Sequence, residues 1–328
     1  MIARFPLACS VLVAVALATV ASDQRPDRPV PVVAGPVLTT AVRPAVGDTA
    51  DQAAAMSDCN PQNLRASLRP QGPLPAPGQM PAGSAMARIA KRGYLIAGVL
   101  RDTYPFAFRD INLRPEGFDI DVARDITEAM FGDRERVVFR PLREAARLDM
   151  TTSGQVDLVV ATVTITCKRR QRVDFSAVYY EAGQRVLVNR GLAITSLADL
   201  RGKEVCAARG STSLERILAD PAKPIPVAAA TATDCLMLLQ LGSVDAVSTD
   251  DTLLAGMAAQ DPRTEVIGPQ LAEEPYGIAI KKDAPELVRF VNAVLERRAA
   301  DGRWRASYER WLTPLGPAPS PPAPQYRD

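Results

Sequence analysis

Two similar phrases lie far apart in this chain, and each is typical of a helix that leads into a buried strand. They are Gln155-Val156-Asp157-Leu158-Val159 and Ser243-Val244-Asp245-Ala246-Val247, and each precedes a change to Thr or Asp. Two copies of one helix-then-strand unit predict two α/β sheets that face a common cleft. Because ligands of open α/β sheets bind beyond the carboxyl ends of the strands, we expect the site at residues 162–169, 210–212 and 249–251.

Between the two ends of the chain, segments with the apolar period of a strand alternate with segments that have the period of a helix. This predicts an α/β fold with mostly parallel sheets. Strands are expected at residues 95–99, 137–139, 157–161, 186–188, 204–207, 227–229, 245–248 and 278–280. Helices are expected after Gly117, at 143–152, from the capping box Thr212-Ser213-Leu214-Glu215, at 235–241, at 252–259, and over stripes that end at Leu295 and Leu312. The spacing predicts a first lobe of residues 86–183 plus 277–313 and a second lobe of residues 184–276.

The two ends of the chain have a different composition. Arg4 precedes an apolar run that ends at Ala21, which predicts a secretory signal peptide over residues 1–21, with an uncleaved membrane anchor as the alternative. Residues 22–85 are rich in Pro, Ala, Gly and Ser and predict a tether or disordered arm, and residues 314–328 form a Pro-rich tail. We therefore expect an exported protein, periplasmic or associated with the cell envelope.

Composition excludes several classes of function. The 328 residues carry a net charge of only +2, which gives no basis for nucleic-acid binding. The chain has no histidine, so His-based zinc sites, Ser-His-Asp triads and His proton shuttles are excluded. Five cysteines without a C-x-x-C pair do not predict a structural zinc site either, and we expect neither metal nor cofactor.

The segment 161–180 carries the most specific motif. It contains Thr164-Ile165-Thr166-Cys167-Lys168-Arg169, then Val173-Asp174-Phe175-Ser176, then Tyr179-Tyr180. This order, T-I-T-x-x-R followed by V-D-F-S and a Tyr pair, resembles the signature of the extracytoplasmic amino-acid-binding proteins, solute-binding protein family 3. The resemblance runs from about residue 88 to 312 and includes 117–121, 275–280 and the ending Asp301-Gly302-x-Trp304.

The resemblance implies a two-lobe periplasmic-binding-protein fold of type II with the ligand cleft between the lobes. It implies a monomeric binding protein, not an enzyme, which captures a small amino acid by closing and delivers it to the permease of an ABC importer. The Cys206/Cys235 pair, the S-T-D-D-T phrase at 248–252 and the Pro-rich tail are similar to the actinobacterial glutamine- or glutamate-binding type.

The same resemblance implies roles for residues at the strand ends. Arg169 would clamp the ligand α-carboxylate, because a guanidinium matches a carboxylate with two parallel hydrogen bonds; the alternative is a surface Arg in a basic turn. Thr164 would add a hydroxyl and a backbone N–H. Thr162, or the carbonyl of Ala161, would accept the ligand ammonium. Asp250 would pair with that ammonium, and its alternative role is to cap the following helix.

In the second lobe, the loop Gly210-Ser211-Thr212 would supply N–H groups and hydroxyls to the carboxylate. Arg101, Arg147 and Arg209 are further cations near the predicted cleft, and one of them pairing a side-chain carboxylate would favour glutamate or aspartate. Leu100 and Thr103 stand where relatives for neutral ligands often carry an acid and an aromatic residue, which argues against glutamine. The ligand class is therefore Glu, Asp, Gln or Asn.

Four cysteines remain if Cys9 is removed with the leader, and they allow three pairings. Topology favours Cys206 with Cys235, because both fall in the second lobe. Cys59 would then pair with Cys167, and buried free thiols are the alternative.

Two rival functions stay open. One is a sensor of the same ligand whose closed form engages a membrane receptor. The other is an exported dehydratase of the cyclohexadienyl type on this fold, for which Glu144 and Glu181 would be the candidate general acids.

Overall fold

The computed structural model describes residues 63–328, which belong to the unit Asp48–Asp328. The predicted signal peptide, most of the predicted arm, and Cys59 lie outside the described residues. The prediction that Cys59 pairs with Cys167 therefore stays a prediction. Among the described residues no helix is both long and apolar enough to cross a membrane.

The first sheet has the strand order β4-β1-β5-β12-β6. The strands β1 (Leu95–Val99), β4 (Val137–Pro141) and β5 (Leu158–Val159) are parallel. The strand β12 (Ala279–Ile280) returns from late in the sequence and pairs antiparallel with both β5 and β6 (Asp174–Phe175). We call this sheet and the helices packed on it the first lobe.

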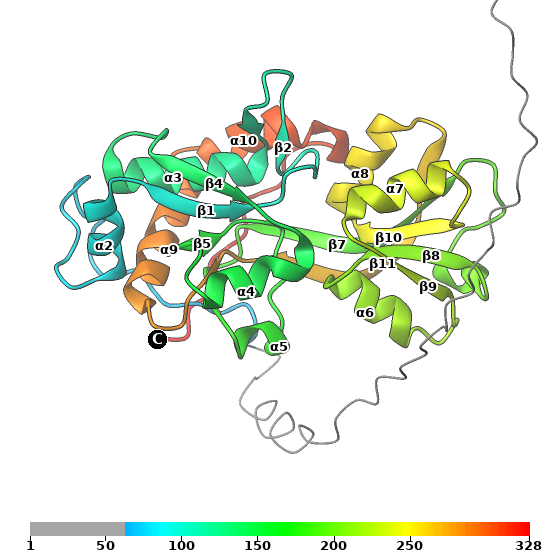
Figure 1. Cartoon of the computed structure of the whole chain (residues 1–328), viewed down its shortest axis with the longest axis horizontal. Helices are drawn as coiled ribbons and strands as arrows, with labels where there is room; N and C mark the ends of the chain where they lie inside the picture. The colour runs from blue at the N-terminus through cyan, green and yellow to red at the C-terminus, as the bar shows by residue number, and fades with distance from the viewer. Residues whose placement is uncertain (1–62) are drawn as a thin grey trace, which may run out of the picture. The chain divides into compact units, whose positions relative to one another are not determined.

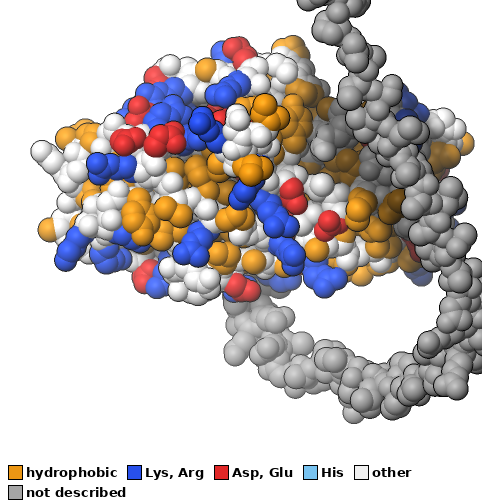
Figure 2. Space-filling view, turned by 45° about the horizontal axis from the view of Figure 1, so that its top comes forward, with side chains coloured by type: hydrophobic (Ala, Val, Ile, Leu, Met, Phe, Trp, Pro, Cys, Tyr) orange, Lys and Arg blue, Asp and Glu red, His pale blue; other side chains and the backbone are white. Residues whose placement is uncertain are grey.

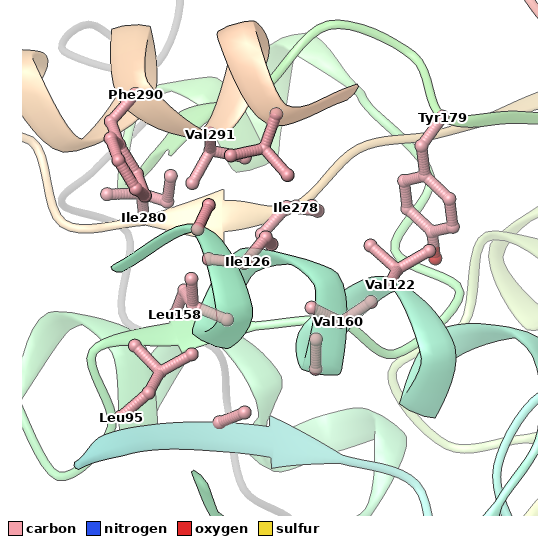
Figure 3. Packing of buried hydrophobic residues seen from close by; sticks show 14 of the residues in the cluster. Leu95, Val122, Ile126, Leu158, Val160, Tyr179, Ile278, Ile280, Phe290 and Val291 are labelled. Carbon is pink, nitrogen blue, oxygen red and sulfur yellow. The ribbon is translucent and has the colours of Figure 1, made fainter. Parts of the chain in front are cut away.

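Helices α3 and α9 cover one face of the first sheet (Figures 1 and 3). Val122 and Ile126 of α3 and Phe290 and Val291 of α9 are buried in one cluster with Leu158 of β5. The described helices of this lobe are α2 (Ala85–Arg92), α3 (Phe118–Phe131), η2 (Glu144–Ala146), α4 (Arg147–Thr152), α5 (Cys167–Arg170), α9 (Pro285–Ala300), α10 (Arg303–Trp311) and η4 (Thr313–Leu315).

Gly117 begins α3 because no other residue fits there. Its φ is 125°, and a Cβ at this position would lie 2.3 Å from the carbonyl oxygen of Phe106. The helix also carries Asp119 and Asp121 in its first turn, where carboxylates interact favourably with the helix dipole.

The second sheet has the strand order β11-β7-β10-β8-β9. Its strands are β7 (Tyr180–Asn189), β8 (Glu204–Ala208), β9 (Ile225–Ala229), β10 (Ala246–Asp250) and β11 (Thr264–Tyr276). Its helices are η3 (Leu197–Leu200), α6 (Thr212–Ala219), α7 (Ala232–Gln240) and α8 (Asp251–Gln260). We call this sheet and its helices the second lobe. Cys206 of β8 and Cys235 of α7 form the predicted disulfide, which joins this sheet to a helix on its face.

The two sheets are mixed rather than mostly parallel. In the first sheet β12 is antiparallel to its neighbours, and in the second β7 and β11 pair antiparallel over a long register that begins at Tyr180 and Tyr276. Both tyrosines are buried in the core of the first lobe, whereas the far ends of the strands belong to the second sheet. These two strands therefore connect the lobes (Figure 1). The sequence predicted only the core of β7 and did not predict β11.

Residues 63–69 and the end of the tail lie against the first lobe. The Ser67 hydroxyl donates to the carbonyl of Phe175 at 2.7 Å, and the buried Asn292 donates to the Ser67 hydroxyl at 2.8 Å. The backbone of Ser67 also exchanges hydrogen bonds with Gln325 and Arg327. This differs from the expectation of a disordered arm and a solvated tail. Arg170 and Asn292 of the body donate to backbone carbonyls of residues 64–68, and the end of the tail pairs in turn with the backbone of Ser67.

On one face of the molecule, charged side chains of both signs lie near one another (Figure 2). Figure 2 shows Lys and Arg side chains among acidic and apolar ones on the face that it presents. This distribution fits the small net charge of the whole sequence.

Candidate functional site

The carboxyl ends of strands from both sheets meet at a set of buried charged side chains. Arg169, on the short helix α5 after β5, is buried. Its guanidinium donates to the carbonyl of Thr164 at 2.8 Å and, across the lobes, to the carbonyl of Gly210 at 3.1 Å. Burial, together with the neighbouring Arg147, lowers the pKa of Arg169 to about 10, so that the group remains a cation at neutral pH. Arg169 is therefore not a solvated surface arginine, which was the alternative.

Gly210 is the point of close approach between the lobes. Its φ is 81°, and a Cβ there would lie 2.7 Å from the Cα of Ala145 in the first lobe. The helix α6 begins directly after this loop. Its N-cap is Ser211, whose hydroxyl accepts from the N–H of Leu214 at 3.1 Å, so the capping residue lies one position before the predicted Thr212. The hydroxyl of Thr212 is therefore not used to cap this helix.

Asp250 ends β10 and is buried on the second-lobe side. Its carboxylate accepts from the hydroxyl of Tyr276 at 2.5 Å. Burial raises the pKa of Asp250 to about 8, and the negative charge of Glu274 adds to this. Asp250 also occupies the N-cap position of α8, but its side chain makes no capping hydrogen bond, so the alternative capping role is not seen.

Thr162 has a strained backbone at the end of β5. Its φ is 45°, a region that a β-branched residue rarely adopts. Asp119 stabilises this backbone conformation. Its carboxylate accepts from the N–H of Thr162 at 3.1 Å and from the hydroxyl of Tyr179 at 2.8 Å. Burial raises the pKa of Asp119 to about 7. The predicted ammonium acceptors, Thr162 and the carbonyl of Ala161, thus lie on a rigid, polar turn.

Arg147 lies behind this turn and is buried. It donates to the carbonyls of Ala161 at 2.9 Å and Thr162 at 3.0 Å, and its Nε donates to the carbonyl of Glu144 at 3.0 Å. Of the three additional arginines that the sequence proposed, it is the one that the fold brings to the strand ends. Arg101 and Arg209 are exposed; Arg101 lies 3.9 Å from Asp102, and Arg209 donates to the carbonyl of Ala228 at 3.3 Å.

Glu274 is a central residue that the sequence reasoning missed. It lies on β11 and is 2 % exposed. One carboxylate oxygen accepts from the hydroxyl of Thr164 at 2.5 Å and from the hydroxyl of Thr212 at 2.8 Å. Glu274 therefore links the first lobe, the second lobe and a connecting strand at one point. The motif that begins at Pro275 stands beside it, but nothing in the local pattern distinguishes Glu274 from its exposed neighbour Glu273.

Glu144 is a second buried acid at the contact between the lobes. Its Oε1 accepts from the N–H of Ala232, at the start of α7, at 3.3 Å. Its Oε2 is buried and accepts no hydrogen bond among the described residues. Burial raises the pKa of Glu144, an effect that the cation of Arg147 opposes. Glu181, the other acid considered for a dehydratase, instead pairs with Arg65 at 2.5 Å.

The described part of the chain holds no group of acidic or sulfur side chains that could bind a metal ion. Within it, the arrangement offers a buried guanidinium, a buried carboxylate and several hydroxyls from two lobes. Such a set can bind a small molecule that carries both charges. The roles predicted for the individual residues remain predictions.

Comparison with known proteins identifies the family. Residues 95–314 match the model of the bacterial extracellular solute-binding proteins, family 3. The chain is 35% identical over 229 residues to the ABC transporter glutamine-binding protein GlnH of Bacillus subtilis, a match that covers 69% of this chain and 84% of that protein. It is 30% identical over 253 residues to the glutamate-binding protein GluB of Corynebacterium efficiens, covering 73% of this chain and 84% of that protein.

A solved structure has the same fold. An ancestral arginine-binding protein bound to glutamine is 35% identical, with a TM-score of 0.63, and the match covers 67% of this chain and 98% of that one. Its two sheets flanked by helices correspond to those described above. The family model describes solute-binding proteins and these relatives are binding proteins, which favours binding over the dehydratase alternative. The chain belongs to the bacterial extracellular solute-binding proteins, family 3.

Proposed function

We propose that this protein captures a free amino acid between its lobes and delivers it to an ABC importer. The observation that carries the proposal is that Arg169 of the first lobe and Asp250 of the second are both buried at facing strand ends. The charges of a zwitterion match this pair, with the α-carboxylate toward Arg169 and the ammonium toward Asp250. Closure is favoured by contacts that the open state lacks.

The loop Gly210-Ser211-Thr212 supports the carboxylate end of the proposed ligand. It begins α6, whose N-terminal N–H groups favour an anion. Thr164 would support the same end through its backbone N–H, because its hydroxyl and that of Thr212 both donate to Glu274. Thr162 and the Ala161 carbonyl serve the ammonium end beside Asp250.

We further propose that the ligand side chain is an amide and that glutamine is preferred, because Glu144 supplies the buried acid that is missing at Leu100 and Thr103. Glu144 supplies an unused, buried acceptor, and the cation of Arg147 lies next to it. An amide both donates through its NH2 and accepts through its oxygen, so it complements an acid and a cation together. A ligand carboxylate would bring a second negative charge to Glu144. The glutamine-binding relative and the glutamine-bound solved structure support this choice.

We propose that the domains of the chain correspond to the two lobes and the two end segments. Residues 86–183 and 277–313 would form the first lobe, 184–276 the second, and 314–328 a tail. The leader 1–21 and the arm 22–85 would export the protein and keep it at the cell envelope, where it would act as a monomer.

The direct test is calorimetry with the twenty amino acids, preceded by a thermal-shift screen. A ligand that binds only the folded protein raises its melting temperature, and we expect glutamine to do so most strongly. The absence of a response to every amino acid would contradict the proposed function. Tighter binding of glutamate than of glutamine would contradict the amide preference alone.

Glu144→Gln should change the preference between amide and acid. The variant loses the carboxylate that would accept from the ligand NH2, so glutamine affinity is expected to fall by roughly tenfold to a hundredfold, the range for a hydrogen bond to a charged group. The affinity for glutamate should fall less, because the substitution also removes the repulsion between the ligand's side-chain carboxylate and Glu144. Glu309→Gln, which removes the same charge from an exposed ion pair with Arg305 within α10 of one lobe, is the matched control and should bind like the unaltered protein.

Ligand binding should release a proton at neutral pH. Because the pKa of Asp250 is raised to about 8, the carboxyl is largely protonated before binding and must ionise to pair with an ammonium. The affinity for the amino acid should therefore fall as the pH decreases below about 8. The free energy of unfolding of the unliganded protein should change in the opposite sense and fall as the pH rises from about 4 to about 8. Calorimetry in buffers of different ionisation enthalpy would measure the release. Asp250→Asn should abolish it, and equal release from that variant would refute this assignment.

A further inference from the structure

A projecting hairpin of the first lobe carries two exposed apolar side chains at its tip. The hairpin consists of β2 (Phe108–Arg109) and β3 (Pro115–Glu116). At its tip, Ile111 is 98% exposed and Leu113 is 69% exposed. In Figure 1 the hairpin, labelled β2, extends away from the helices beside it. Neither side chain contributes to the cores or to the proposed amino-acid site.

The tip is held in a fixed shape. The carboxylate of Asp110 accepts from the N–H of Asn112 at 2.9 Å and from the N–H of Arg114 at 2.8 Å. At the base, Phe108 packs edge-to-face against Trp311 with ring centroids 5.6 Å apart. The apolar side chains therefore project from a firmly attached turn and not from a loose loop.

Leu113 is strained as well as exposed. Its φ is 63°, a conformation that favours Gly or Asn and is a rare outlier for a large apolar residue. Folding gains nothing from this residue, because its side chain lies in solvent. A strained backbone that carries an exposed leucine indicates a role outside the folded chain.

Two arginines flank the apolar tip. Arg109 and Arg114 are exposed, and neither is within ion-pair distance of a carboxylate in residues 63–328. Closer to the body, Glu116 is paired with Arg310 at 3.4 Å and lies 3.8 Å from Arg124. The one acid at the tip, Asp110, accepts from backbone N–H groups and keeps its negative charge. With two arginines against this one acid, residues 109–114 have an apolar end and a net charge of +1.

We propose that this hairpin tip binds the surface of an anionic lipid bilayer. Ile111 and Leu113 would enter the boundary between headgroups and acyl chains, and Arg109 and Arg114 would lie among the phosphates. A protein partner is the weaker choice, because two side chains bury far less than the roughly 1,000 Å² of a specific interface. Insertion of so small a tip is weak by itself, but a chain that is held near the membrane gains effective concentration. The inference is independent of which amino acid the cleft binds.

The experiment places a fluorescent probe at the tip of the full chain. Ile111→Trp is mixed with vesicles of phosphatidylcholine, with or without phosphatidylglycerol, in which the acyl chains are brominated. We expect the added tryptophan to be quenched by the anionic vesicles and much less by the neutral ones. Leu218→Trp is the matched control, because Leu218 is an exposed apolar residue, 64% exposed, on α6 of the other lobe. It should not be quenched, even if another part of the chain attaches the protein to the vesicle.

Two further variants separate the contributions. In the Ile111→Trp background, Arg109→Gln with Arg114→Gln should raise the lipid concentration that gives half-maximal quenching by roughly thirtyfold. This is the effect expected for two arginines at an anionic surface. Leu113→Asn should also weaken it, while the melting temperature stays equal or rises because asparagine tolerates the left-handed backbone. Equal emission of the added tryptophan with and without anionic vesicles would overturn the proposal. Shielding of this tryptophan only when a membrane protein is present would also overturn it, in favour of a protein partner.

Discussion

Arg169→Ala is expected to weaken binding of the preferred amino acid at least roughly thirtyfold. Removing one partner of a buried charge pair costs about 2–5 kcal/mol, and 2 kcal/mol corresponds to about thirtyfold in affinity. The structure adds a second reason for a large effect. Arg169 also donates to carbonyls of Thr164 and Gly210, one from each lobe, so its loss removes a contact that closure creates.

Calorimetry with glutamine would measure this loss. Arg209→Ala is the matched control, because Arg209 is an exposed arginine near the same loop and should bind normally. Arg169→Lys keeps a cation without the planar fork and should fall between the unaltered protein and the alanine variant. Melting temperatures would identify a variant that is simply less stable. A folded Arg169→Ala protein with unchanged affinity would show that Arg169 does not bind the ligand.

Glu274→Ala is expected to produce a comparable loss although Glu274 is not proposed to contact the ligand. Its carboxylate accepts from the hydroxyls of Thr164 and Thr212, and each such hydrogen bond to a charged group contributes about 1.5–3 kcal/mol. Without it the open arrangement is favoured, and the apparent affinity falls with the fraction of the binding-competent state. Glu274 can keep one of the two hydrogen bonds when the lobes part, so closure depends on the other, and its loss of about 1.5–3 kcal/mol corresponds to roughly tenfold to a hundredfold in affinity.

The neighbour of Glu274 provides the control. The side chain of Glu273 is 75% exposed and pairs with Arg65 at 2.8 Å, so Glu273→Ala removes the same charge from the same strand without breaking the link between the lobes. Small-angle scattering without ligand should show a more open average shape for Glu274→Ala only. Equal affinities and equal scattering for the two variants would contradict the linking role. Glu274→Gln, which keeps an acceptor, should have the smaller effect of the two substitutions at position 274.

Much of the second lobe could be predicted because its signals are local. The strand expected at 204–207 is β8, the one at 227–229 lies within β9, and the paired Cys206 and Cys235 follow from their common place in one lobe. Each of these predictions depends on apolar spacing over a few residues. Such spacing is retained in the structure because β8 is buried and β9, at the edge of the sheet, pairs with it along its whole length.

The long strands that join the lobes could not be predicted in the same way. The burial pattern of β11 includes exposed and half-buried positions without regular alternation, because the strand runs from the second sheet to the core of the first lobe, with a register shift between Ile267 and Ala272. A strand with changing surroundings has no single period. The contacts of the tail and of residues 63–69 were likewise not predicted, because local composition does not reveal partners such as Asn292 for Ser67, or Ser67 for Gln325.

The sequence by itself determined the family, the two-sheet architecture, and the positions of Arg169 and Asp250 at strand ends, because each follows from a continuous motif or a local period. Only the tertiary structure decided that Glu274 joins Thr164 and Thr212, and that Arg147 rather than Arg101 or Arg209 reaches the strand ends. Thr164 and Glu274 are 110 positions apart, and no local pattern relates residues at that separation. Their contact exists because two strands cross between the lobes and bring both sheets' ends to one point.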